Sequence, residues 1–233
     1  MNKRYWAETL VLGTFLVVAT ALIGYSGADL ALSSCFWIDG KWPIGDQFFW
    51  QLLYKLDRIP SIMLGVAGLI LFARSFVHSG YLHWRRPGAY LVLLLILGPG
   101  LLVNSVFKEH WGRPRPREVV EFSGKKQFLH PWQKGESGKG RSFPSGHSSA
   151  AFYMAAPYLI YRRRDRKRAF QWLSGGILFG IVMSAARITQ GAHFLSDTLW
   201  SFGMVALCAL LLAALFRLDD DSPFAPMSDE RHS

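Results

Sequence analysis

The sequence predicts an all-α protein, a bundle of six transmembrane helices. Two observations predict this fold class. Apolar residues make up 51% of the 233-residue chain and fall into long blocks, most of them long enough to cross the ~30 Å hydrocarbon core of a bilayer as a helix. Lysine and arginine gather in short connections between the blocks. We expect a single domain over residues 1–233, the usual number for a chain of this length.

Five apolar blocks have the length of a membrane span. They are Trp6–Gly24, Ile59–Phe76, Tyr90–Phe107, Phe170–Ile188 and Thr198–Phe216. A sixth block, Ser148–Tyr161, is shorter, and we count it as the sixth span. The first block follows Lys3 and Arg4 and could be a signal peptide, but it is long, lacks a small-x-small cleavage site and precedes further spans. We therefore expect it to remain as the first helix.

The first outer segment, residues 28–58, alternates aromatic with polar residues. Its aromatic residues are Phe36, Trp37, Trp42, Phe48, Phe49, Trp50 and Tyr54. This pattern favours a segment on the membrane surface, with a helix over Asp46–Asp57. That helix would form a lip beside a lipid-entry route or a simple interfacial anchor, and the sequence leaves both open.

Later connections have their own patterns. Gly98-Pro99-Gly100 is expected to kink the third span, because proline lacks a backbone donor. The longest soluble segment, Glu109–Phe143, follows that span. Residues 219–233 are predicted to form a polar, loosely ordered cytoplasmic tail.

The chain has a net charge of +10, and the distribution of its basic residues predicts how the spans are oriented in the membrane. Basic residues crowd the connection Arg162–Arg168, flank the first span and form the pair Arg85-Arg86 in another short connection. This bias is typical of cytoplasmic loops. We therefore expect both termini in the cytoplasm, the longer connections outside, and no nucleic-acid partner.

The two cysteines are not expected to pair. Cys35 lies in the first outer loop and Cys208 in the last apolar block. At such different depths they are too far apart for a disulfide. Neither a disulfide framework nor a thiolate metal site is predicted.

A first motif, Lys108-x6-Arg115-Pro116, follows the third span. With Arg113 and Arg117 it concentrates four cations just past a helix end. An arginine fork binds two oxygens of a phosphate and lysine adds a point charge, so the cluster fits a phosphomonoester. A basic helix end in contact with lipid headgroups is the alternative, although outer basic residues run against the orientation rule.

A second motif, Pro144-Ser145-Gly146-His147, stands directly before the fourth span. The free N–H groups and the dipole of a helix start favour an anion there. Gly146 permits a close backbone approach or an unusual φ, and Ser145 can cap the helix or donate its hydroxyl to a phosphate oxygen. An ordinary helix start with a chance histidine is the alternative.

A third motif, Arg187-x5-His193-x3-Asp197, precedes and opens the last span. Its histidine and carboxylate share one helix face. A carboxylate bonded to one imidazole nitrogen fixes the tautomer and frees the other as nucleophile or base, as in the serine triad. A metal pair or a surface ion pair also fits this spacing, but a metal would need further ligands, and His147 is the one obvious candidate.

Together the three motifs resemble those of the type 2 phosphatidic acid phosphatase family, which shares its site with vanadium haloperoxidases. The motifs cover Lys108–Asp197, and the span pattern extends the resemblance over most of the chain. The resemblance implies a set of phosphate-binding residues: Lys108, Arg115, Ser145, Gly146 and Arg187. It also implies that His193 attacks phosphorus to form a phosphohistidine, that Asp197 orients His193, and that His147 protonates the leaving oxygen. No metal or other cofactor is implied.

The chain departs from the family at one position and resembles one subgroup. Ala186 stands before Arg187, where the family usually has serine, and we expect this to affect fine positioning but not the reaction. The segment from Trp111 to Phe143 is similar to a bacterial subgroup that includes lipid A phosphatases. The resemblance therefore implies a bacterial inner-membrane protein with its active site on the periplasmic face.

The predicted function is that of a membrane lipid phosphate phosphatase. Lipid A, phosphatidylglycerophosphate, phosphatidate and a prenyl diphosphate all present a terminal phosphate on an apolar body, and the sequence does not select among them. A lipid-to-lipid phosphotransferase would use the same site. A catalytically silent transporter or scaffold would have no chemical reason to keep acid, nucleophile and cations, and membrane embedding disfavours a haloperoxidase. The oligomeric state is not predicted.

Overall fold

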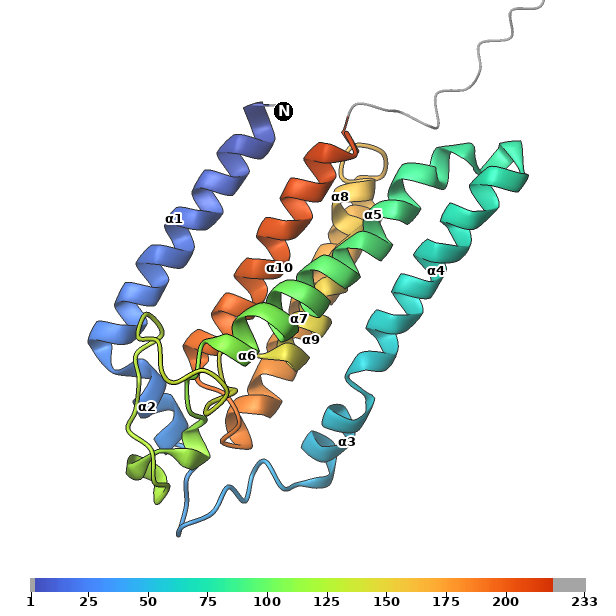
Figure 1. Ribbon diagram of the computed structural model, residues 1–233. Coiled ribbons are helices and arrows are strands. Elements are labelled where there is room, and N and C mark those ends of the chain that lie inside the picture. Colours follow the sequence, from blue (N-terminus) through green and yellow to red (C-terminus); the bar gives the residue numbers. More distant parts are fainter. Residues whose placement is uncertain (1–2, 220–233) are drawn as a thin grey trace, which may run out of the picture.

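The computed structural model describes residues 3–219, and these are folded as an all-helical bundle (Figure 1). The longer helices are α1 (Lys3–Ser26), α4 (Arg58–Val77), α5 (Arg85–Leu95), α9 (Arg166–Thr189) and α10 (Leu195–Leu215). The shorter ones are α2 (Ala28–Ser34), α3 (Phe48–Leu56), α6 (Lys108–His110), α7 (Gly146–Tyr153) and α8 (Pro157–Tyr161). The segments η1 (Ser79–Trp84), η3 (Pro116–Glu118) and η4 (Val120–Phe122) are 3₁₀ helices, and η2 (Ile96–Phe107) is a π-helix. The predicted all-α class is confirmed, since the described residues contain isolated bridges but no strand.

Within residues 3–219, five helical stretches are long and apolar enough to cross a membrane. They are Lys3–Ser26, Phe48–Val77, Ser79–His110, Arg166–Thr189 and Leu195–Leu215. Each matches one of the five longer apolar blocks of the sequence, and the last block runs one residue past its helix, to Phe216. In the third stretch, α5, η2 and α6 follow one another without a break, which carries the chain directly to the first motif.

The sixth apolar block is a broken helix at the centre of the bundle. It forms α7 and α8, which are separated by a turn at residues 154–156. The break has a local cause, because Pro157 has no N–H to donate and favours the first position of a new helix. Ala151 and Tyr153 of α7 are fully buried. Neighbouring helices therefore enclose α7.

The third span changes helix type where it contains proline. Residues 96–107 form a π-helix, in which hydrogen bonds span five residues. Pro99 removes one donor from the segment, and Asn104 Nδ2 donates to the carbonyl of Pro99 at 2.6 Å. Where the sequence predicts a kink, the span has a stretch of π-helix that ends at Phe107, directly before Lys108.

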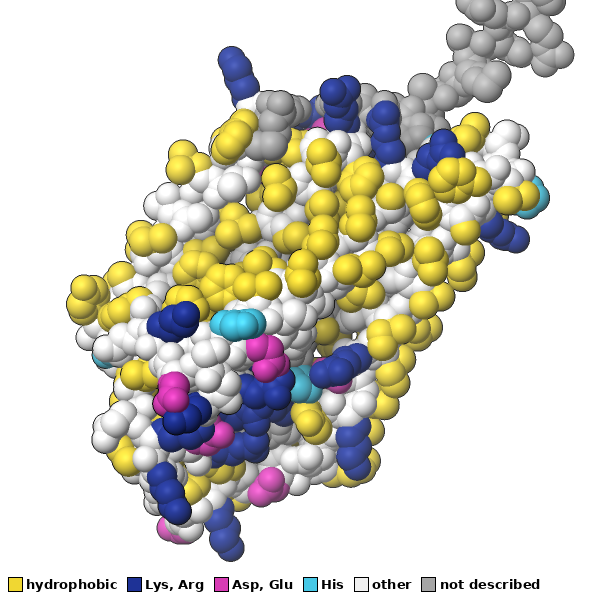
Figure 2. Space-filling view, viewed as in Figure 1, with side chains coloured by type: hydrophobic (Ala, Val, Ile, Leu, Met, Phe, Trp, Pro, Cys, Tyr) yellow, Lys and Arg dark blue, Asp and Glu magenta, His cyan; other side chains and the backbone are white. Residues whose placement is uncertain are grey.

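The two ends of the bundle carry different features. The start of α1, the connection between α4 and α5, and the connection between α8 and α9 lie at one end, and α2, α3 and the segment after α6 lie at the other (Figure 1). An apolar band covers the middle, with charged side chains gathered at both ends (Figure 2). Both expected groups of basic connections thus share the end where α1 begins.

The basic connection at that end is more than an orienting charge run. Arg162 is buried and pairs with Glu8 of α1 at 2.8 Å and with Asp219 at 2.6 Å. Asp219, expected to begin a loose tail, is therefore fixed in the fold. The rest of the predicted tail, residues 220–233, lies outside the described residues.

Aromatic residues at the opposite end form a small core of their own. Trp42 packs against Trp37 and Phe122, with ring centroids 5.3 and 5.4 Å apart. Phe194, next to the third motif, belongs to the same cluster. Trp37 and Trp42 are half-buried against this cluster, and the placement of segment 28–58 on the membrane surface stays a prediction. A helix is present where Asp46–Asp57 predicts one, namely α3.

Candidate active site

The three motifs meet at the end of the bundle that lies opposite the start of α1. Lys108 opens α6, Ser145 caps the N-terminus of α7, and Arg187 lies in the last turn of α9. His193 stands in the connection to α10, and Asp197 lies in the first turn of that helix. Helix ends that are far apart in the sequence therefore converge on one place.

The cations of the site are crowded and poorly neutralised. Lys108 and Arg187 are buried, and each lies within electrostatic reach of Arg115. Burial and the neighbouring Arg117 lower the pKa of Arg115. Within residues 3–219, Nε of Arg187 has no hydrogen-bond partner. Buried cations in such numbers require a counter-charge, and a phosphate dianion fits this need.

Arg187 is held in place by neutral groups. Its guanidinium lies over the Tyr54 ring, 4.6 Å from the centroid, and donates to Gln190 Oε1. Gln190 in turn donates to the backbone carbonyl of Trp50 at 3.3 Å. The side chain is therefore oriented without losing its charge to a carboxylate.

The second motif contributes a helix start and an open backbone. Ser145 Oγ accepts from Ser148 N at 3.3 Å and from Ser148 Oγ at 2.9 Å, so the serine acts as the helix cap, and its own hydroxyl proton remains to be donated. Gly146 has no positive φ. A Cβ there would lie 2.4 Å from Asn104 Oδ1 and 3.1 Å from Lys108 Nζ. Of the two predicted reasons for this glycine, the close approach of Asn104 and Lys108 is the one that applies.

His193 is fully buried and has one nitrogen engaged. Its Nδ1 lies 2.7 Å from the carbonyl oxygen of Ser142, and so donates to it. Its Nε2 finds no partner in the part of the chain that the structure describes. Burial lowers the pKa of His193 to about 4, against the opposing effect of Asp197. The imidazole is therefore neutral at pH 7, with a lone pair on Nε2.

Asp197 supports this histidine less directly than expected. Its Oδ2 is 3.7 Å from His193 Nδ1, beyond a good hydrogen bond. The same oxygen accepts from Ser142 Oγ at 2.6 Å and from the Phe194 N–H at 2.8 Å. Asp197 thus fixes the segment whose carbonyl orients the histidine.

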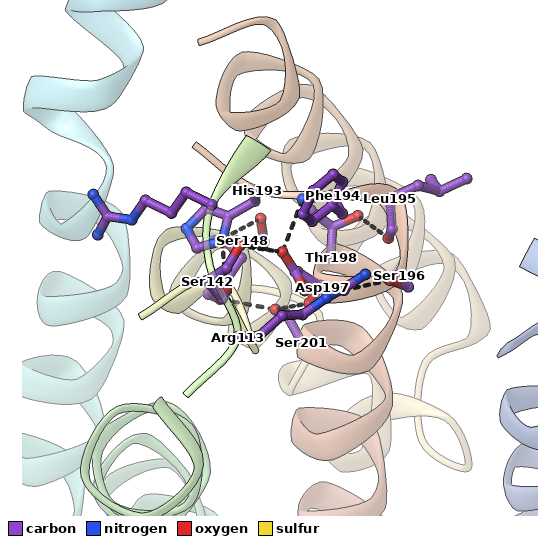
Figure 3. A network of polar contacts seen from close by, with 12 residues as sticks. Arg113, Ser142, Ser148, His193, Phe194, Leu195, Ser196, Asp197, Thr198 and Ser201 are labelled. Atoms are coloured by element: carbon purple, nitrogen blue, oxygen red, sulfur yellow. Dashed lines mark hydrogen bonds and ion pairs between the residues drawn. The ribbon is translucent and has the colours of Figure 1, made fainter. Parts of the chain in front are cut away.

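Arg113 completes this network from behind (Figure 3). It donates to Asp197 Oδ1 at 2.5 Å and to Asp29 Oδ2 of α2 at 2.8 Å. Ser196 Oγ also donates to Asp29, at 2.6 Å. The expectation that Arg113 joins the phosphate-binding cations is wrong, because the side chain is fully buried and bound to two carboxylates.

His147 lies against a tyrosine and a carboxylate. Its ring centroid is 4.9 Å from that of Tyr54, and its Nε2 is 3.6 Å from Asp57 Oδ2. Burial and the charge of Arg187 lower the pKa of His147.

Sequence reasoning missed four residues of this site, namely Asp29, Tyr54, Asp57 and Ser142. A signal was available for the two aspartates, since each is a lone carboxylate next to a long apolar block. Ser142 acts through its backbone carbonyl as well as its hydroxyl, which residue type does not reveal. In residues 3–219 no group of three or more His, Cys, Asp or Glu side chains is arranged to hold a metal ion.

Comparison with known proteins places the chain in a family. A family model described as the PAP2 superfamily matches residues 89–220. The lipid A 4′-phosphatase of Francisella tularensis subsp. novicida (strain U112) is 33% identical over 204 residues, which cover 86% of this chain and 88% of that protein. The lipid A 4′-phosphatase of Rhizobium leguminosarum is 30% identical over 216 residues, with 89% and 91% covered.

Other similar proteins are named for a different lipid. Phosphatidylglycerophosphatase B of Bacillus subtilis (strain 168) is 25% identical over 154 residues, covering 64% of this chain and 68% of that protein. A solved transmembrane PAP2-type phosphatidylglycerolphosphate phosphatase from Bacillus subtilis has the same fold, with a TM-score of 0.50 at 19% identity, over 92% of this chain and 98% of that chain. Family match, relatives and fold agree with the three motifs: the chain belongs to the PAP2 superfamily, as a membrane lipid phosphatase.

Proposed function

We propose that this protein hydrolyses a terminal phosphomonoester of a membrane lipid through a phosphohistidine on His193. The observation that carries the proposal is the free Nε2 of a buried, neutral His193 beside the buried cations Lys108 and Arg187. A neutral imidazole held by a hydrogen bond at Nδ1 is a competent nucleophile at Nε2. The cations and the α7 start would bind the phosphate and the charge that develops on it.

The reaction then needs two steps. His193 Nε2 forms a bond to phosphorus while the bond to the lipid oxygen breaks, and His147 gives its proton to that oxygen. A water molecule next attacks phosphorus, gives a proton back to His147, and the P–N bond breaks to release phosphate. Lys108, Arg115 and Arg187 bind the phosphate oxygens, and Ser145 and the Gly146 N–H donate to them.

Lipid A is the substrate that the relatives favour. Two of them are lipid A 4′-phosphatases that match most of their own length and of this chain. The substrate's apolar body would stay in the bilayer while its phosphate enters the site. Phosphatidylglycerophosphate is the second candidate, on the basis of the Bacillus subtilis relative.

We further propose that the site opens at the periplasmic face of the bacterial inner membrane. The basic connections lie at the opposite end of the bundle (Figure 1), which is the cytoplasmic end by the orientation rule. In this arrangement α7 and α8 together make the sixth crossing, and the start of α1 lies in the cytoplasm.

Phosphate release by purified protein in detergent micelles tests the function. The panel contains lipid A, phosphatidylglycerophosphate, phosphatidate and undecaprenyl diphosphate. We expect release from at least one lipid, loss of turnover in His193→Ala, and acid-labile phosphate on the native protein after rapid quenching. The control is His78→Ala, an exposed histidine at the other end of the bundle.

Three other outcomes would change the proposal. Near-native activity of His193→Ala would exclude this nucleophile. Phosphate found on a second lipid, and not in solution, would indicate the phosphotransferase. Because the site uses Lys and Arg as its cations, activity should survive EDTA, and loss that a divalent ion restores would contradict the metal-free scheme.

A further inference from the structure

A buried carboxylate beside the site has no part in the steps above. Asp57 caps the junction of α3 and α4, and its side chain is 6% exposed. Its Oδ2 has no hydrogen-bond partner among the described residues, and the nearest arginine, Arg58, reaches it at 3.9 Å from an exposed position. A buried polar group without a partner is unfavourable and calls for a reason in a native fold.

The geometry connects Asp57 with one neighbour in particular. Its Oδ2 lies 3.6 Å from His147 Nε2, so an approach of about 0.7 Å would complete a charge-assisted hydrogen bond. His147 Nδ1 is buried and also finds no partner within residues 3–219. The Tyr54 ring, 4.9 Å away, restricts rotation of the imidazole. Hydrogen bonds of this kind often tighten when a substrate binds.

The charges around His147 make such a partner necessary. Arg187, Lys108, Arg58 and His193 all disfavour a proton on this imidazole. They come from α9, α6, α4 and the connection before α10, and among the described residues Asp57 is the one carboxylate within 4 Å of the His147 ring nitrogens. A leaving-group acid must carry its proton when the reaction begins. A carboxylate close to Nε2 favours the protonated ring.

We propose that Asp57 is a positioning residue for this acid: it accepts a hydrogen bond from Nε2–H of His147 and so keeps a proton on Nδ1 for the leaving lipid oxygen. The inference rests on the proposed function and adds the residue that makes His147 an acid. As the P–O bond breaks, its electron pair stays on the lipid oxygen, which takes the Nδ1 proton. The Nε2 proton remains with the His147–Asp57 pair, and water later returns a proton to Nδ1.

The test compares Asp57→Asn with native protein on two probes, lipid A and 4-nitrophenyl phosphate. Asparagine keeps the shape but not the charge. We expect a loss of about 10²-fold with lipid A, near the lower bound for general acid catalysis. With the aryl phosphate, whose leaving group needs no proton, we expect less than about a threefold loss. The alkaline limb of the pH profile with lipid A should move to lower pH, and Asp57→Glu, which keeps the charge, should restore it. Asp46→Asn, an exposed carboxylate just before α3, is the matched control.

A double variant separates positioning from structure. If Asp57 acts through His147, Asp57→Asn should add no further loss in a His147→Ala background. Equal losses on both probes, or an alkaline limb in Asp57→Asn that stays where the native protein has it, would overturn the inference. Native protein that releases phosphate from neither probe nor from the lipid panel would refute the proposed function itself. An active native protein with an unaffected Asp57→Asn would refute the role of Asp57 alone.

Discussion

At the scale of single residues, the site separates the groups that we propose bind the phosphate from the groups that hold them in place. His193 leaves Nε2 free because Nδ1 is engaged by the Ser142 carbonyl. Asp197 accepts hydrogen bonds from Arg113 and Ser142. Burial keeps the histidine neutral. A nucleophile held in this way is available at once, without first losing a proton.

The protonation of His193 gives a prediction at this scale. Its pKa is lowered from an ordinary value near 6.5 to about 4, so the imidazole should stay unprotonated as the pH falls from 7 to 5. Between about 6.5 and 4 the unfolded chain binds a proton here and the folded protein does not, so stability falls as the pH falls through this window. Histidine NMR in detergent should show a resonance, absent in His193→Gln, that titrates near pH 4. A midpoint near 6.5 would contradict the buried, neutral nucleophile.

At the scale of elements, α1 is attached to the bundle at a few defined points. Leu16 is buried over Gly203 of α10, where a Cβ would lie 2.5 Å from the leucine side chain. Nearer the site, Trp200 donates to Thr20 Oγ at 3.0 Å. At the other end the attachment is electrostatic, through Arg162. The helix thus depends on α10 and on the end of α8 for its place.

The Arg162 contacts predict that the protein loses stability when this side chain is cut back to alanine. Arg162→Ala leaves Asp219, whose side chain is 1% exposed, buried without its main partner. Removing one member of a buried ion pair destabilises by about 3–5 kcal/mol. The thermal midpoint of unfolding in detergent should therefore be lower in Arg162→Ala. Adding Asp219→Asn to that variant should recover part of the lost stability. Lys167→Ala, an exposed charge of the same connection, should leave the midpoint unchanged; an equal shift there would indicate a general charge effect.

At the scale of the whole molecule, charge is divided between two ends of an apolar bundle (Figure 2). One end carries the basic connections and the other carries the site with its buried cations. Cations on the outer side oppose the usual bias, and buried ones are unfavourable unless they serve an anion. The proposed function would explain the buried cations at the site end, and the proposed orientation would explain the exposed basic residues at the other.

Cysteine labelling in whole cells tests this orientation. Both native cysteines are replaced by alanine, since Cys35 is exposed at the site end. Ser137→Cys, exposed in the segment after α6, should react with a membrane-impermeant maleimide from the periplasm. Lys167→Cys, exposed in the first turn of α9, should react after the inner membrane is opened. The reverse pattern would place the site in the cytoplasm.

The sequence by itself determined the helices and the set of reacting groups. Long apolar blocks predict spans because a bilayer leaves few other solutions for the backbone. The motifs name residues that lie at helix ends, and the ends on one side of an antiparallel bundle must lie together. Hence Lys108, Ser145, Arg187 and His193 were predicted as neighbours.

Only the tertiary structure decided which groups bind one another. Arg113 and Arg115 are two residues apart, yet one is enclosed by Asp29 and Asp197 and the other stays near the phosphate-binding cations. Ser142 and Asp57 enter the site through segments that carry no motif. Spacing within one helix fixes which side chains share a face, but contacts between helices depend on how their surfaces pack, and that packing is a property of the whole chain.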